Sequence, residues 1–143
     1  MIHVPTGGGG RVEHLVRRGF IARTGDLLAR VHPEEGPVEE IASPFDAVVD
    51  FQRLHGKQAP RHAPIIGLRR VVLATTEGRV RWVSTLGPVL VGTMVALVVT
   101  PEGHIRPHRA PAAGFIGRSF IANGKRIEAG APLVEIRGEE LAG

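Results

Sequence analysis

The 143-residue chain contains no cysteine, so disulfides, thiolate metal sites and cysteine nucleophiles are excluded. Lysine is scarce, because Lys57 and Lys125 stand against 16 arginines. Aromatic residues make up only 4% of the chain, and the net charge is +4 with acids interspersed among the bases. A nucleic-acid groove would need clustered cations and stacking aromatics, and we therefore expect no binding to nucleic acid.

Long apolar segments are also missing. The N-terminus, MIHVPTGGGG, lacks the apolar core and cleavage site of a signal peptide. The most apolar run, residues 89–99, includes Gly92 and Thr93 and is shorter than the ~20 residues of a membrane helix. We expect a soluble cytoplasmic protein with no membrane association.

Glycine and proline are abundant, at 19 and 11 residues, and 43% of the chain is hydrophobic. Such a composition favours many short strands joined by turns around a core. Helical periodicity is poor, and short alternating apolar runs predict an all-β chain. We expect strands at residues 12–16, 27–31, 38–42, 48–54, 65–73, 80–84, 95–100, 105–109, 115–121 and 133–137.

The sequence contains an internal repeat of about 68 residues. Residues 10–12 (GRV) recur at 78–80, and Gly56-Lys57 recurs at Gly124-Lys125. In the middle the offset slips to 67, as two compensating single-residue insertions or deletions would produce. Five further pairs follow one of these two offsets: Gly19 and Gly87, Gly25 and Gly92, Pro33 and Pro101, Pro44 and Pro111, and Ala63 and Ala131. The repeat predicts two small domains, at residues 1–70 and 71–143, linked around residues 69–77.

Residues 114–136, GFIGRSFIANGKRIEAGAPLVEI, resemble the last third of a biotin carboxyl carrier domain. Residues 83–99 resemble that family's first hairpin, and Gly25-Asp26-Leu27-Leu28 resembles its turn-to-strand step. The resemblance implies two tandem barrel-sandwich hybrid repeats of the biotinyl/lipoyl type. It also implies turns at four glycines, namely Gly19, Gly25, Gly87 and Gly124.

That family attaches biotin or lipoate to a lysine at the tip of a central hairpin. The matching column holds Gly103 in the second repeat, and the corresponding segment of the first repeat, residues 32–37, also holds a glycine, Gly36. Lys57 and Lys125 follow glycines in a later turn, where we expect solvated loops. The resemblance therefore implies an unmodified scaffold without a cofactor.

The first repeat also resembles the C-terminal β domain of the succinylglutamate desuccinylase/aspartoacylase family. The shared segment is Glu39-Glu40-Ile41-Ala42-Ser43-Pro44, after the Gly-Asp-x-Leu step. Because that family's zinc catalytic domain is absent from this chain, the likeness implies an accessory β module and transfers no catalytic residue.

Histidines supply one candidate metal site. His104 and His108 are four residues apart, so on one strand they would face the same side. Zinc would need a third ligand, such as Glu102 or His32. The His-x-His pair of some zinc peptidases with a related fold is missing. We expect an ordinary polar hairpin, and we expect His14, His55 and His62 to be surface groups.

The other candidate groups have plain structural explanations. Glu34-Glu35 and Glu39-Glu40 could pass for an acid–base pair, but consecutive strand residues point to opposite faces. Residues 7–10, GGGG, lack the Lys-Ser/Thr of a phosphate loop and read as a flexible lead into the first strand. Three serines, Ser43, Ser84 and Ser119, lack a nucleophile elbow. We predict no catalytic, cofactor-binding or metal-ligating residue.

Aromatic residues leave one question open. We expect Trp82 in the core with Phe20, Phe51, Phe115 and Phe120, whereas an exposed Trp82 would mark a contact surface.

These observations favour a non-catalytic protein-interaction module or accessory subunit, with a larger enzyme complex as one setting and oligomerisation left open. The alternatives are a degenerate carrier or metal-dependent enzyme component, and a small-ligand binding module.

Overall fold

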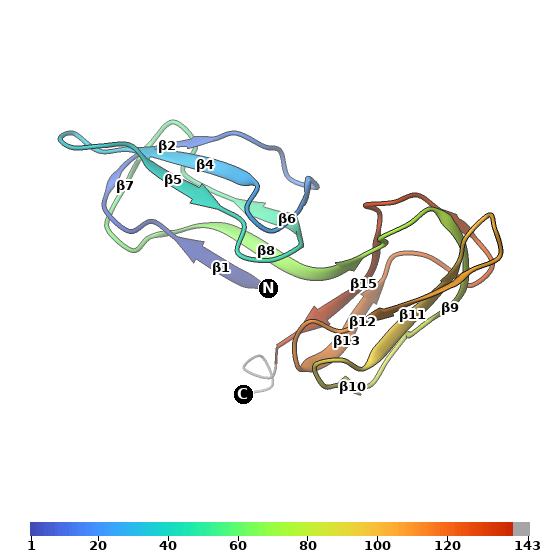
Figure 1. Ribbon diagram of the computed structural model, residues 1–143. Coiled ribbons are helices and arrows are strands. Elements are labelled where there is room, and N and C mark those ends of the chain that lie inside the picture. The colour runs from blue at the N-terminus through green and yellow to red at the C-terminus, as the bar shows by residue number, and fades with distance from the viewer. Residues whose placement is uncertain (139–143) are drawn as a thin grey trace. The chain divides into compact units, whose positions relative to one another are not determined.

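A computed structural model describes residues 1–138 of the chain (Figure 1). These residues form an all-β structure, 53% strand with no helix, arranged in several antiparallel sheets. The all-β prediction is confirmed. Within the described residues there is accordingly no helix that could cross a membrane.

The chain divides into two compact units, the first spanning Met1–Arg70 and the second starting at Val71. In Figure 1 the first unit runs from blue to green and the second continues to red. The first unit contains β1 (Ile2–Pro5), β2 (Gly10–His14), β3 (Ile21–Ala22), β4 (Leu27–His32), β5 (Glu39–Ala42), β6 (Ala47–Gln52), β7 (Gln58–Ala59) and most of β8 (Pro64–Leu73). The second contains β9 (Gly78–Val83), β10 (Pro88–Val89), β11 (Met94–Val99), β12 (Ile105–Arg109), β13 (Gly114–Ser119), β14 (Arg126–Ile127) and β15 (Pro132–Arg137).

Each unit has a four-stranded sheet and a second layer of strands, and both contribute side chains to its apolar core. In the first unit the sheet has the order β5-β4-β2-β7, and β3, β6, β8 and β1 form the other layer. Its core takes Val12 and Leu28 from the sheet and Val49 and Leu68 from the other layer. In the second unit the sheet order is β12-β11-β9-β14, and β10, β13 and β15 form the other layer.

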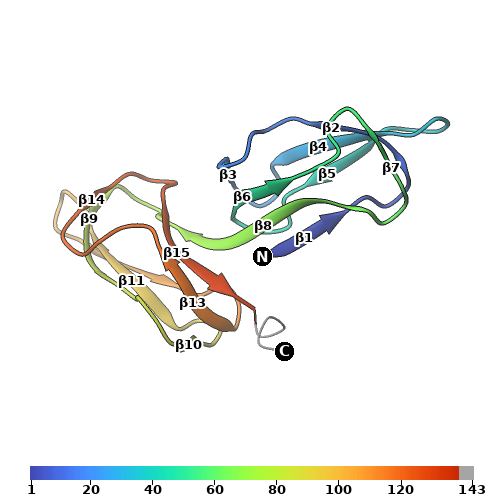
Figure 2. The same ribbon diagram turned by 180° about the vertical axis from the view of Figure 1, so that it is seen from behind.

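Strand pairing in the two units corresponds strand for strand. β2 pairs with β4 and β7 as β9 pairs with β11 and β14, and β3-β6-β8 corresponds to β10-β13-β15. Turn hydrogen bonds repeat as well: Gly56 N donates to Val12 O at 2.7 Å, and Gly124 N donates to Val80 O at 2.6 Å. Figure 2 shows the short strands β3 and β14 from behind.

Strand β8 belongs to both units. Residues of its first part pair with β1 and β6, whereas Val71, Val72 and Leu73 pair with β15. The two arrangements match, because Pro5 pairs with Pro64 in the first unit and Leu73 pairs with Pro132 in the second. The last residues of β8 thus serve the second unit as β1 serves the first.

Four parts of the sequence prediction were wrong. β1 was missed, because its four residues precede a glycine run, and Gly7–Gly9 connect β1 to β2 instead of leading into a first strand. The two-residue strands β3, β7, β10 and β14 were missed because they are too short to show alternation. The expected link at residues 69–77 is strand as far as Leu73. Trp82, Phe20 and Phe115 are exposed rather than core.

Turn glycines agree with the prediction. Gly19, Gly25, Gly87 and Gly124 all have positive φ, between 84° and 108°. Side chains rarely adopt this region, which explains glycine at these turns.

Candidate functional site

The hairpin tips of the two four-stranded sheets are glycine turns. Gly36 lies between β4 and β5 with φ 96°, and Gly103 lies between β11 and β12 with φ 87°. Gly103 N donates to Thr100 O at 2.9 Å, and His104 N donates to Thr100 Oγ1 at 3.0 Å. These bonds close a tight turn in which a side chain at Gly103 would be strained by its backbone conformation.

Both lysines lie elsewhere, in the turns that precede β7 and β14. Their side chains are exposed, as predicted, and their carbonyl oxygens accept hydrogen bonds from Val12 N at 3.0 Å and Val80 N at 2.8 Å. Lys57 and Lys125 are therefore part of a repeated structural turn.

The structure separates the two histidines that the sequence placed on one side of a strand. His104 precedes β12 and is exposed, whereas His108 is inside β12 and only 4% exposed. The expectation failed because β12 begins at Ile105, after the tip turn. His32, one proposed third ligand, hydrogen-bonds Glu13 instead, with 2.9 Å between Nε2 and Oε1.

His108 has both ring nitrogens occupied. Nδ1 donates to Arg106 O at 3.1 Å, and Nε2 accepts from Thr75 N at 3.0 Å. Burial lowers the pKa of His108 below its ordinary 6.5, against the smaller effect of the Arg106 carbonyl. A neutral ring fixed in this way is a structural group. No cluster of three or more histidines and carboxylates suited to a metal exists within residues 1–138.

The paired glutamates are also separated. Glu39 Oε2 accepts from Gly7 N at 2.9 Å, whereas Glu40 Oε2 lies 3.6 Å from Arg30 Nε. Glu34 and Glu35 are exposed at the tip. The hydrogen bond from His32 lowers the pKa of Glu13, a contact that the sequence did not reveal. These carboxylates form separate surface contacts and no acid–base pair.

The three candidate serines donate hydrogen bonds to the backbone, among them Ser84 Oγ to Leu86 O at 3.4 Å. Ser43 Oγ donates to Phe45 O at 2.6 Å, and Ser119 Oγ donates to Ser84 O at 2.8 Å, so neither is set up as a nucleophile. The His14 ring stacks on His55 with 5.8 Å between centroids, although the two are far apart in the sequence. His62 is exposed.

Trp82 is 37% exposed and lies on the solvent-facing side of β9. Register places it directly opposite Leu97 of β11, and Leu97 directly opposite Pro107 of β12. We name these three residues the apolar row. Arg81 precedes Trp82 at a break in the β9–β11 register.

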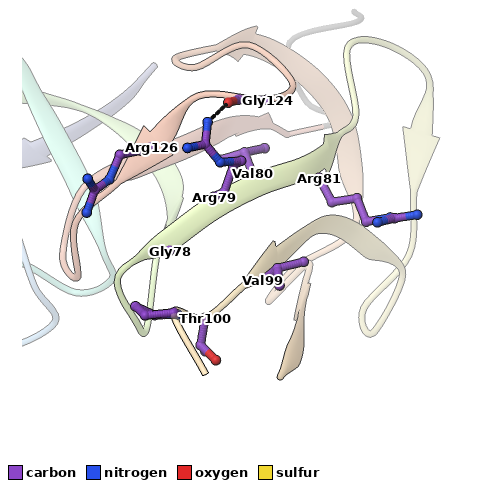
Figure 3. A pocket seen from close by; sticks show the side chains of 9 residues that line it. Gly78, Arg79, Val80, Arg81, Val99, Thr100, Gly124 and Arg126 are labelled. Atoms are coloured by element: carbon purple, nitrogen blue, oxygen red, sulfur yellow. Dashed lines mark hydrogen bonds between the residues drawn. The ribbon is translucent and has the colours of Figure 1, made fainter. Parts of the chain in front are cut away.

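The second unit has a groove of about 560 Å³, whose lining includes Arg81, the residue before Trp82 in β9. It is lined by Gly78, Arg79, Val80, Arg81, Val99, Thr100, Pro101, Gly124 and Arg126. Arg79 and Arg126 are cross-strand partners, and Arg79 Nη1 donates to Gly124 O at 2.7 Å. Figure 3 shows Arg81 extending away from Arg126 along β9. We name this pocket the arginine groove. The sequence did not reveal it, because Arg79 and Arg126 are far apart in the chain and meet only through the pairing of β9 with β14.

Comparison of the chain with protein families, curated proteins and solved structures found no match.

Proposed function

We propose that this chain is a non-catalytic protein-interaction or accessory subunit, built on two tandem barrel-sandwich repeats of the unmodified biotinyl/lipoyl type. The matched strand pairing of the two units supports the duplication. In such a scaffold the carrier lysine belongs at the hairpin tip.

The observation that carries the proposal is the chemistry of those tips. Gly36 and Gly103 occupy them with positive φ, a conformation that disfavours lysine. The lysines of the chain lie in other turns, and His108 is committed to internal hydrogen bonds. A scaffold that keeps its core without carrier chemistry at its tips is suited to contact with other proteins.

Intact mass spectrometry tests the absence of carrier function. The full chain is produced together with a biotin ligase and a lipoate ligase, beside a known carrier domain as the positive control. We expect the sequence mass, allowing for loss of the initiator methionine. An added biotinyl or lipoyl mass on Lys57 or Lys125 would contradict the proposal.

The Gly103→Lys variant sharpens the test. We expect it to remain unmodified, because Pro101, His104 and the tight Thr100 turn present a different hairpin to the ligase. Efficient labelling of this variant would show that the tip is still a carrier tip lacking only its lysine.

A further inference from the structure

The same sheet face has opposite character in the two units. In the first unit, register aligns Glu13, Arg30 and Glu40 across β2, β4 and β5. Arg30 pairs with Glu40, and Glu13 bonds His32. At the corresponding positions of the second unit stand Trp82, Leu97 and Pro107, the apolar row.

The positions next to this row also change from polar to apolar between the two units. His32, opposite Arg11 in the first unit, is replaced by Val99, opposite Arg79 in the second. Val99 in turn lies opposite Ile105, which is 59% exposed. The face whose charged side chains pair with one another in the first unit is therefore apolar in the second unit. Trp82 and Ile105 are exposed, and Leu97 and Val99 are partly exposed. Neighbouring apolar side chains on a surface mark contact sites.

Charge differs between the two sheets as well. Strands β9, β11, β12 and β14 carry five arginines and no aspartate or glutamate. Strands β2, β4, β5 and β7 carry two arginines and three glutamates. Arg79 and Arg126 face each other directly, an arrangement of like charges that is unfavourable without an anion. Within the described residues neither arginine has a carboxylate partner.

We propose that this face of the second unit, made of the apolar row, Ile105 and the arginine groove, docks an acidic segment of a partner protein. The segment's apolar side chains pack on Trp82 and Leu97, and its carboxylates bind Arg79 and Arg126. This inference rests on the proposed interaction function and names the chemistry of the partner. Arginine and tryptophan are the residue types that dominate such interfaces.

The proposed contact is with the face of the sheet, and an added strand is disfavoured at the β12 edge. Among the described strands, β12 forms one edge of this sheet and pairs there with β11 alone. Pro107 lies in the middle of β12 and has no N–H to donate to a new strand. Side-chain contacts on the face therefore supply the affinity.

The test begins with a selection from a phage library of random linear peptides against the full chain. Binding of the enriched peptides is then measured by anisotropy of the labelled peptide. Trp82 is the only tryptophan, so its fluorescence independently reports contact at the face. We expect enriched peptides with acidic residues beside aliphatic or aromatic ones, and a change in Trp82 fluorescence on binding.

Two double variants change the side chains of the proposed docking face, and a third variant is the matched control. Trp82→Glu with Leu97→Arg installs the pair that the first unit holds in the same register, so the fold has a precedent for it. Arg79→Gln with Arg126→Gln removes the charge of two exposed side chains, together with the hydrogen bond from Arg79 to Gly124 O. Each double variant should weaken peptide binding by at least ~tenfold, the effect expected for interface anchors. Arg11→Gln, at the position that matches Arg79, should bind like the wild type.

Several results of the peptide experiment would overturn the inference: no enriched peptide, enrichment of basic peptides, binding unchanged in both double variants, or a dimer that the Trp82→Glu/Leu97→Arg variant dissociates. Tight binding of a single-stranded oligonucleotide that needs Arg79 and Arg126 would also overturn it.

Capture of partner proteins from the native host separates this inference from the proposed function. A stoichiometric protein held equally by the wild type and both double variants would refute the docking face alone. Capture of no protein by the wild type would refute the proposed function.

Discussion

His108 occupies in the second unit the place that Ile41 holds in the first. His108 pairs in register with Ala96, and Ile41 pairs with Ala29, and all four residues are buried. An imidazole at an apolar position must stay neutral, and its two hydrogen bonds replace the contacts it would make in water.

Stability should therefore fall in mild acid. Burial lowers the pKa of His108 in the folded state, whereas the unfolded chain keeps the ordinary value of about 6.5. As the pH drops through about 6.5, only the unfolded state gains this proton, so the free energy of unfolding decreases until the folded pKa is passed. Urea unfolding of the wild type and His108→Ile, at several pH values below neutrality, measures the effect. The variant should lose part of the acid slope, and an unchanged slope would show that other groups cause it.

Turn glycines make a second residue-scale prediction. Gly25 and Gly92 have φ of 90° and 88°, with open space where a Cβ would stand. Valine at either position therefore pays for backbone strain and not for a clash, at about 1–3 kcal/mol of unfolding free energy. Gly8 also has open space but no positive φ, so Gly8→Val is the control and should cost less. Equal destabilisation of all three variants in chemical unfolding would contradict this account. Gly19, Gly87 and Gly124 belong to the same class.

A strand at residues 65–73 was predicted, but the repeat pattern did not reveal that β8 pairs with strands of both units. The offset of about 68 residues relates the longer strands of the second unit to those of the first. Because β1 is short and flanked by glycines, its counterpart at the end of β8 was interpreted as a link. Pairing shows that Val72 contacts β15 while Leu68 contacts β1 and β6.

Substitutions in β8 should consequently destabilise either core, depending on which part of the strand they change. Leu68 is fully buried in the core of the first unit, and Val72 lies in that of the second. Leu68→Ala should cost about 2–5 kcal/mol and lower amide protection around Val12 and Leu28. Val72→Ala should instead lower protection around Val95 and Leu133. Hydrogen exchange followed residue by residue distinguishes them, and identical patterns for both variants would show that the cores unfold as one.

The sequence predicted most strands because alternation and turn glycines are local signals. Strands β4, β8, β11 and β12 begin and end within two residues of the expected positions. The candidate face was less predictable, because it depends on cross-strand register. Nothing in the spacing of Trp82, Leu97 and Pro107 shows that they form one row, or that Arg79 lies opposite Arg126.

At the scale of the whole molecule, the two units share strand pairing but not surface chemistry. The first unit keeps ionic pairs on the face where the second unit presents apolar groups and two arginines, Arg79 and Arg126, that have no carboxylate partner within residues 1–138. The two units thus have the same strand pairing but different side chains on this face. An interaction role is consistent with this, because the shared scaffold positions the surface and the surface side chains determine which partner binds.

The most direct test of that role is sedimentation of the chain as isolated from its native host, with mass spectrometry of every co-sedimenting protein. We expect a stoichiometric complex with at least one other protein, through an interface burying at least ~1,000 Å². A chain that sediments as a monomer, captures no protein and binds a metabolite tightly would contradict the account.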